Sequence, residues 1–178
     1  MKTILATIIL TSLISVNEWS FKANIDESNL IIKGTSSVHD WESTVSEFSV
    51  SGVMSDTEIN NLDVQVIVKS ISSGKSIMDD KTYDALKANK FSKVFFKSTK
   101  LDVSGDKISG MGTLELAGAK KEVPISAKVV NQTAASFTIR GEVELDMTEF
   151  GIEPPTAMFG TLETGEVVTI EYQLLLNK

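Results

Sequence analysis

Apolar and polar positions alternate along most of this chain after its first 16 residues. The clearest run is 137–147, where odd positions are apolar or glycine and even positions are threonine, arginine or acidic. The segments 62–69, 122–129 and 168–176 repeat this period of two. Such a period places apolar side chains on one face of a β-strand and polar ones on the other, which is typical of antiparallel sheet with one wet and one dry side. The pattern predicts an all-β protein.

Turn-forming residues separate the expected strands at 104–106, 131–133 and 163–165. Glycine, asparagine, serine and threonine gather there between apolar runs, as they do where a chain reverses direction. Many strands joined by short turns favour a barrel or a sandwich.

Two strands carry irregularities. Apolar parity changes along 41–54, from odd at Trp41 to even at Phe48, which predicts a β-bulge near 46–47. Gly110 and Gly112 lie on the inward parity of another strand, so we expect sharp curvature there or room for another group.

The segment 79–89 breaks the period of two. It has acidic residues at its start, lysines toward its end and no β-branched residue except Thr82, which suits the dipole of a helix. The sequence predicts one short helix here, with Tyr83, Leu86 and Met78 on its apolar side.

The N-terminus has the layout of a secretory signal. Lys2 precedes a run of apolar or small residues over 4–16. As a helix this run would reach about 20 Å, whereas a bilayer core is about 30 Å thick. We expect a signal peptide over 1–18, cleaved between Ser15 and Ser20, and one domain over 19–178 in the periplasm or outside the cell. An uncleaved anchor and a buried N-terminal strand are the alternatives.

Composition removes several classes of site and partner. The 178 residues include no cysteine, which excludes a disulfide scaffold, a thiolate metal site, a cysteine nucleophile and a lipidated cysteine. The net charge is −7, from 17 basic and 24 acidic residues. Nucleic acids and anionic membrane surfaces select basic patches, so neither is an expected partner.

Candidate catalytic groups are few. His39 is the single histidine, and only Asp40 and Glu42 lie near it in sequence, which is too few nitrogen ligands for a zinc site. We interpret His39 as a turn residue that packs beside Trp41. Glu142 and Glu144 project from the polar face of a strand and are interpreted as solvated surface. No catalytic residue, metal or cofactor is expected.

The dry face of the sheet leaves two readings open. Its large apolar side chains would be plain core in a sandwich, but in a closed barrel they can line a cavity for one ligand. Periodicity does not separate these readings, and alone it favours a filled core, because small barrels commonly fill with side chains.

The chain resembles the YceI-like family in four stretches, in order. The stretch 28–41 matches that family's opening strand and turn, and 76–99 matches its acidic helical excursion followed by a strand with Phe-x-Ser character. The stretch 110–125 resembles its Gly-x-Leu-x-Leu-x-Gly hairpin, and 147–170 includes a Phe-Gly-Ile segment and the closing strand. Together they cover nearly all of the expected mature chain.

This resemblance implies an extended, lipocalin-like antiparallel barrel of about eight strands with one short helix. It also implies an exported protein that binds isoprenoids or other amphiphilic lipids in a tunnel without a catalytic set. The sequence departs from the family at Ser92 and Lys93, where many members have proline. A second departure is the apolar insert 153–160, with Pro154, Pro155, Met158, Phe159 and Gly160, which we interpret either as a lid at the barrel mouth or as a loop packed outside.

With the resemblance, the favoured function is non-catalytic binding of an elongated apolar ligand, isoprenoid-like or fatty-acyl, inside the barrel. No stable membrane insertion is expected after signal removal, and the oligomeric state, a dimer included, stays open. The alternatives are an envelope interaction protein with a filled barrel and an enzyme that acts on a bound lipid through His39. Tyr172 is the expected polar contact for a headgroup. The residues expected from parity to line the interior are Trp41, Phe48, Val66, Val68, Leu114, Phe137, Ile139, Val143, Ile170 and Tyr172.

Overall fold

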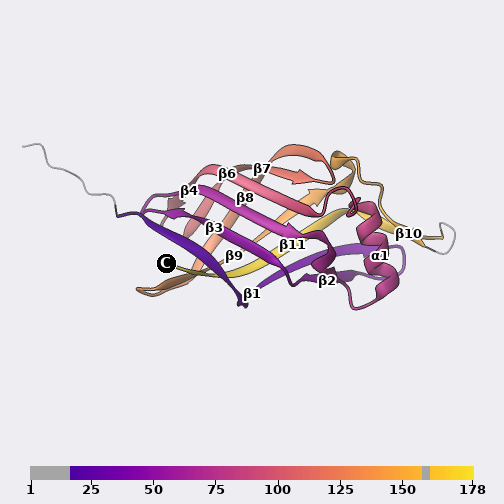
Figure 1. Cartoon of the computed structure of the whole chain (residues 1–178), viewed down its shortest axis with the longest axis horizontal. Coiled ribbons are helices and arrows are strands. Elements are labelled where there is room, and N and C mark those ends of the chain that lie inside the picture. The colour runs from indigo at the N-terminus through magenta and orange to yellow at the C-terminus, as the bar shows by residue number, and fades with distance from the viewer. Residues whose placement is uncertain (1–16, 158–160) are drawn as a thin grey trace, which may run out of the picture.

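A computed structural model of the protein describes residues 17–157 and 161–178 (Figure 1). Most of the expected signal peptide, 1–16, lies outside the described residues, as do Met158, Phe159 and Gly160 of the insert. The first described strand, β1, begins at Trp19.

Eight antiparallel strands close into a barrel. Around the wall the order is β11-β9-β8-β7-β6-β4-β3-β1, and pairing of β1 with β11 closes the circle. The expected all-β fold, a closed antiparallel barrel with one helix, is therefore confirmed. The bounds are β1 (Trp19–Ser36), β3 (Phe48–Met54), β4 (Glu58–Ile67), β6 (Lys93–Ser104), β7 (Lys107–Leu116), β8 (Ala119–Gln132), β9 (Ser136–Asp146) and β11 (Leu162–Asn177).

The short elements supplement this wall, and α1, β2 and β10 lie together at one end of the elongated molecule (Figure 1). None of the helices within 17–157 and 161–178 has the length and hydropathy to cross a membrane. The bounds are β2 (Trp41–Val45), the 3₁₀ turn η1 (Val68–Ser70), β5 (Ile71–Ser72), α1 (Ser76–Ala85), the 3₁₀ turn η2 (Met147–Phe150) and β10 (Thr156–Ala157).

The helix begins three residues before the expected start and ends four before the expected end. Asp79 does not open the helix; its carboxylate accepts hydrogen bonds from Ser72 and Ser73, which orders the corner before α1. After Ala85 the chain continues in turns, and Lys87 adopts a left-handed φ of 54°, which ends helical propagation.

The parity change in 41–54 has a different origin from the predicted bulge. β2 and β3 both pair antiparallel with β1, and the chain is interrupted between them at 46–47. There the backbone N–H groups of Ser46 and Glu47 turn away from the ladder and donate to the carbonyl and the hydroxyl of Ser70, respectively. Regular alternation puts one residue between two inward positions. An interruption of two residues therefore shifts the parity, as a bulge would.

The turn predictions met three outcomes. The turn at 104–106 joins β6 to β7 as expected. The turn after β8 comes slightly later than 131–133, because β8 continues to Gln132. The prediction at 163–165 was wrong, since these residues lie inside β11. Gly165 is there because a Cβ atom would lie 2.4 Å from Oγ1 of Thr35 on the neighbouring strand β1.

The two inward glycines of β7 leave room for side chains of β6. A Cβ atom at Gly112 would lie 2.3 Å from Cζ of Phe96, and one at Gly110 would lie 2.8 Å from Cδ2 of Leu101. The expectation of room for another group is confirmed, and the groups are two side chains of this barrel.

The end of the barrel opposite α1 is filled. Phe21 and Phe137 meet there edge to face, with ring centroids 5.4 Å apart and an interplanar angle of 84°. Both are almost completely buried, as are Leu101, Ile108 and Leu176 around them. This packed cluster closes one end, so any internal space must open toward the other.

The wall has a seam between β8 and β9. These strands pair only from Ala127 and Gly141 onward to the turn that joins them. In the rest of their described lengths, the first part of β8 pairs with β7 alone and the second part of β9 pairs with β11 alone. Phe150 and Ile152, which follow β9, are buried in one cluster with Val123 of the first part of β8.

Candidate functional site

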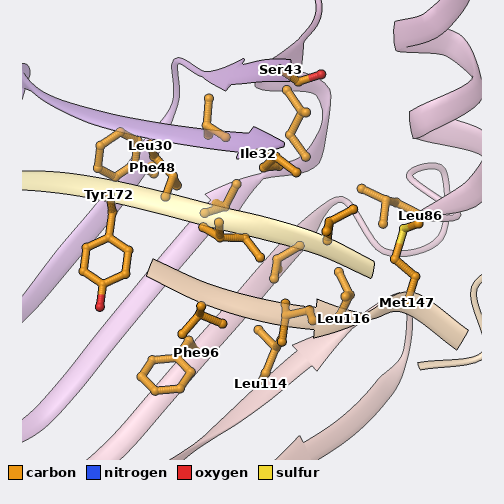
Figure 2. Close-up of a pocket in the computed structure, with 18 of the residues that line it drawn as sticks. Leu30, Ile32, Ser43, Phe48, Leu86, Phe96, Leu114, Leu116, Met147 and Tyr172 are labelled. Atoms are coloured by element: carbon orange, nitrogen blue, oxygen red, sulfur yellow. The ribbon is translucent and has the colours of Figure 1, made fainter. Parts of the chain in front are cut away.

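The barrel encloses a cavity of about 430 Å³. Side chains from all eight barrel strands and from α1 form its lining, and most of them are aliphatic. Figure 2 shows these side chains converging from β-strands on opposite sides of one space. Cavities of about 300–1,000 Å³ are typical of sites that hold small ligands. The dry face of the sheet is therefore partly core, at the packed end, and partly the wall of a cavity.

Eight of the ten residues expected to line the interior do line this cavity, namely Trp41, Phe48, Val66, Leu114, Ile139, Val143, Ile170 and Tyr172. Val68 and Phe137 are placed elsewhere. Val68 is in η1, where the β4 strand has ended and strand parity no longer applies. Phe137 is 1% exposed in the packed end of the barrel, against Phe21. Whether the eight contact a ligand stays a prediction.

Tyr172 lines the cavity, but its hydroxyl already has a partner. The phenol donates a hydrogen bond of 2.9 Å to the backbone carbonyl of Ser126, at the point where β8 and β9 part. Burial raises the pKa of Tyr172, so the phenol keeps its proton at any physiological pH. Its oxygen can still accept a hydrogen bond, but its proton is not available to a headgroup while this bond exists.

The mouth of the cavity lies at the α1 end. It is bordered by the β1–β2 turn, by α1 and by the β10–β11 hairpin, which contribute Val38, Lys81 and Thr156 to the lining. The ring of Trp41 is fixed there, because its Nε1 donates a 3.0 Å hydrogen bond to the carbonyl of Thr35 and a Cβ atom at Gly34 would collide with the ring.

Hydrogen bonds hold α1 across this mouth. The hydroxyl of Tyr83 lies 3.0 Å from the carbonyl oxygen of Lys69 and 2.9 Å from that of Ile71. Lys81 donates from Nζ to the carbonyl of Thr156 in β10, at 2.6 Å. The described part of the insert 153–160 thus reaches the mouth, where Pro155 and Thr156 line the cavity.

Several lining residues were missed from the sequence. Met78, Thr82 and Ala85 of α1 and Leu86, the residue after it, line the cavity, but strand parity says nothing about such positions. Ser43 was missed because it is polar, although it shares the inward parity of Trp41 and Val45 and lies between them in β2. That position in an otherwise apolar series was the available signal.

His39 lies at the mouth, as expected for a turn residue. It is exposed, and its Nδ1 lies 2.8 Å from the carbonyl oxygen of Asp40. The described residues contain no group of three or more histidine and carboxylate side chains placed to hold a metal ion. The geometry therefore offers an apolar enclosure with polar groups at its rim.

Comparison with known proteins assigns the family. The family model described as the YceI-like domain matches residues 19–176. A comparison with curated protein sequences finds no match.

Solved structures share the fold. BcnA of Burkholderia cenocepacia superposes with a TM-score of 0.70 at 16% identity, covering 86% of this chain and 98% of that one. A polyisoprenoid binding domain from Saccharophagus degradans, implicated in plant cell wall breakdown, gives 0.69 at 12% identity, covering 88% and 97%. The YCEI protein of Campylobacter jejuni gives 0.62 at 14% identity, covering 99% and 93%. With a family model that spans the whole barrel, this chain belongs to the YceI-like family.

Proposed function

We propose that this protein binds an elongated apolar ligand, isoprenoid-like or fatty-acyl, inside its barrel and sequesters or carries it. The observation that carries the proposal is the cavity, whose walls are mostly apolar side chains, with the charged groups of the lining near the mouth. Transfer of apolar surface from water into such a space is favourable by about 25 cal/mol per Å². A long hydrocarbon chain can therefore bind without a charged anchor.

The comparisons support the same function at a coarser level. A family neighbour from Saccharophagus degradans is described as a polyisoprenoid binding domain, and its barrel matches this one along most of both chains. Membership of this family favours a binding protein over an enzyme.

Export is part of the proposal. The basic start and short apolar run of residues 1–16 support delivery to the periplasm or the outside of the cell. A lipid carrier is useful in such a compartment, because long apolar chains do not cross aqueous space unaided. Edman sequencing of protein from its natural host would test this, and an intact residue 1 would contradict it.

The two alternatives make different predictions. A barrel that acted only through its surface would not need an internal space, so the cavity disfavours that reading. An enzyme that used His39 would lose turnover in a His39→Ala variant, whereas a carrier would keep its affinity. His39 lines the rim of the cavity, and the hydrogen-bond contact of its ring there is with a backbone carbonyl, that of Asp40, which supports the carrier over acid–base chemistry.

The experiment that tests the proposal is extraction of bound lipid. Protein purified from its natural host is extracted with organic solvent and the extract analysed by mass spectrometry. We expect a long-chain apolar compound in stoichiometric amount. After delipidation the protein should bind diphenylhexatriene, an uncharged elongated fluorophore, and release it to added isoprenoid quinone or fatty acid. Absence of lipid from the extract together with no binding of the probe would overturn the proposal.

A further inference from the structure

Four serines are buried in the described part of the chain, and one of them differs from the rest. Ser55, Ser70 and Ser98 each donate from their hydroxyl to a backbone carbonyl. Residue Ser43 is only 3% exposed, and its hydroxyl, which is open to the cavity, has no hydrogen-bond partner among the described residues. A hydroxyl that faces a cavity without a protein partner is free to bond to what occupies the cavity.

The unpaired hydroxyl lies in the cavity wall. Ser43 is the register partner of Ile32 in β1, and both residues line the cavity. Figure 2 shows Ser43 on its strand among the apolar lining side chains, with Ile32 beside it. Its neighbours of the same parity in β2, Trp41 and Val45, also line the cavity. The hydroxyl is thus a single polar group in an apolar part of the wall.

This hydroxyl keeps its donor and its acceptor lone pairs available to a molecule in the cavity. The three other buried serines donate to carbonyls of the protein, whereas Ser43 can bond only to what occupies the cavity. We propose that Ser43 hydrogen-bonds the polar end of the ligand and that this end is uncharged. This inference rests on the proposed function and adds the chemistry of the headgroup.

The surroundings argue for an uncharged partner. The charged side chains of the lining, Lys81 and Glu163, come from α1 and from the start of β11, which border the mouth. The amine of Lys81 already donates to the carbonyl of Thr156. A carboxylate or phosphate placed beside Ser43 would be desolvated without a counter-charge, which is costly. An alcohol, an amide or a quinone carbonyl would need only one hydrogen bond.

The position of Ser43 also orients the ligand. From Ile32, the partner of Ser43, β1 continues to Phe21 at the packed end, at most about 36 Å of strand at about 3.3 Å per residue. The hydrocarbon chain therefore extends from Ser43 toward Phe21, and the polar end stays on the α1 side.

The test compares two ligands that differ only in the headgroup. The delipidated protein is loaded with diphenylhexatriene, which has no hydrogen-bonding group, and the probe is displaced by 1-hexadecanol or by hexadecane. Ser43→Ala should lower the affinity for 1-hexadecanol about three- to ten-fold, which is the effect of one neutral hydrogen bond. The affinities for hexadecane and for the probe should stay unchanged. Palmitate at pH 9 should gain little from Ser43, so the variant should bind it as the native protein does.

Ser98→Ala is the matched control. This variant removes a buried hydroxyl that donates to the carbonyl of Met111, so it should lower the thermal midpoint without changing the ratio of alcohol to hydrocarbon affinity. Ser43→Ala should not lower the midpoint of the ligand-free protein.

Three results would overturn the inference. Equal affinity of native protein for 1-hexadecanol and hexadecane would remove the role of Ser43 while leaving lipid binding intact. An equal change in the affinities for all ligands in Ser43→Ala would show that the shape of the cavity has changed and that no single hydrogen bond has been lost. Failure of native protein to bind any of the three compounds would overturn the proposed function as well.

Discussion

Tyr172 lies directly across Gly141, and the two fit together only because position 141 has no side chain. They are register partners in β11 and β9, and a Cβ atom at Gly141 would lie 2.3 Å from the phenol oxygen of Tyr172. The ring thus passes over β9 to reach the carbonyl of Ser126 in β8. This hydrogen bond joins β11 to β8 at the point where the ladder between β8 and β9 ends.

Gly141→Ala should therefore displace the ring and break the hydrogen bond to Ser126. We expect the free energy of unfolding to fall by about 1–3 kcal/mol, as for other over-packed interior positions, measured by urea denaturation. Tyr172→Phe keeps the ring and should cost about 1 kcal/mol. Because both changes break the same hydrogen bond, the double variant should lose less than the sum. Native stability of Gly141→Ala would contradict this packing.

Trp41 should report on ligand binding through its fluorescence. Its indole lines the cavity, and the other tryptophan, Trp19, is at the start of β1 and is not part of the lining. In a Trp19→Phe variant, addition of a non-absorbing lipid such as hexadecane should shift the emission maximum or change its intensity. The reciprocal Trp41→Phe variant should show no change. A response that followed Trp19 instead would place the ligand elsewhere.

A larger side chain inside the barrel should compete with the ligand for space. Val64 of β4 lines the cavity, whereas its neighbour Gln65 points to the outer face, where it pairs with Asp63. Val64→Phe should weaken diphenylhexatriene binding at least about tenfold, since a methylene-sized change in a packed site is already significant. Gln65→Phe is the matched control and should bind as native. Equal affinity of both variants would place the probe outside the barrel.

Acid should loosen the attachment of α1. Burial alone would raise the pKa of Asp79, but hydrogen bonds from the N–H and hydroxyl of Ser73 and from the hydroxyl of Ser72 outweigh it and lower the pKa below the ordinary value of 3.8. A depressed pKa contributes stability above the ordinary value, and this contribution is lost as the pH falls through the folded-state pKa.

We therefore expect the native protein to have a higher thermal midpoint than Asp79→Asn near neutral pH, with the difference vanishing as the pH falls below about 4. Asp80→Asn, at an exposed position of the same helix, is the control and should differ little from native at any pH. A constant difference between native and Asp79→Asn from pH 7 to pH 2 would contradict the role of the carboxylate.

The strands were predictable because one face of each is dry, and a period of two survives in the sequence wherever that holds. Phe137 shows the limit of this signal: its parity is inward, but parity carries no information on whether an inward residue meets a cavity or another ring. Val68 shows a second limit, because it lies in η1, beyond the end of β4, where alternation no longer assigns a residue to one face of the sheet. Gly165 shows a third limit, because the sequence does not distinguish a glycine that leaves room for a neighbouring side chain from a glycine in a turn.

The cavity itself was not predictable from periodicity, which favoured a filled core. The family resemblance led to the expectation of a hollow interior, and the structure shows a cavity that extends from α1 to Phe21, where the packing of Phe21 on Phe137 closes the barrel. Lys81 and Thr156, which join across the mouth, are far apart in sequence and have no motif in common. Contacts of this kind depend on the tertiary fold, and local sequence patterns do not predict them.

The seam between β8 and β9 has a mechanical consequence. Where β9 pairs with β11 and β7 pairs with β8, widening the wall would require ladder hydrogen bonds to break together. Along the first part of β8 there are no such bonds to β9, and Phe150 and Ile152 pack there with Val123 instead. Widening the barrel at this seam would therefore displace side chains without breaking a β-ladder.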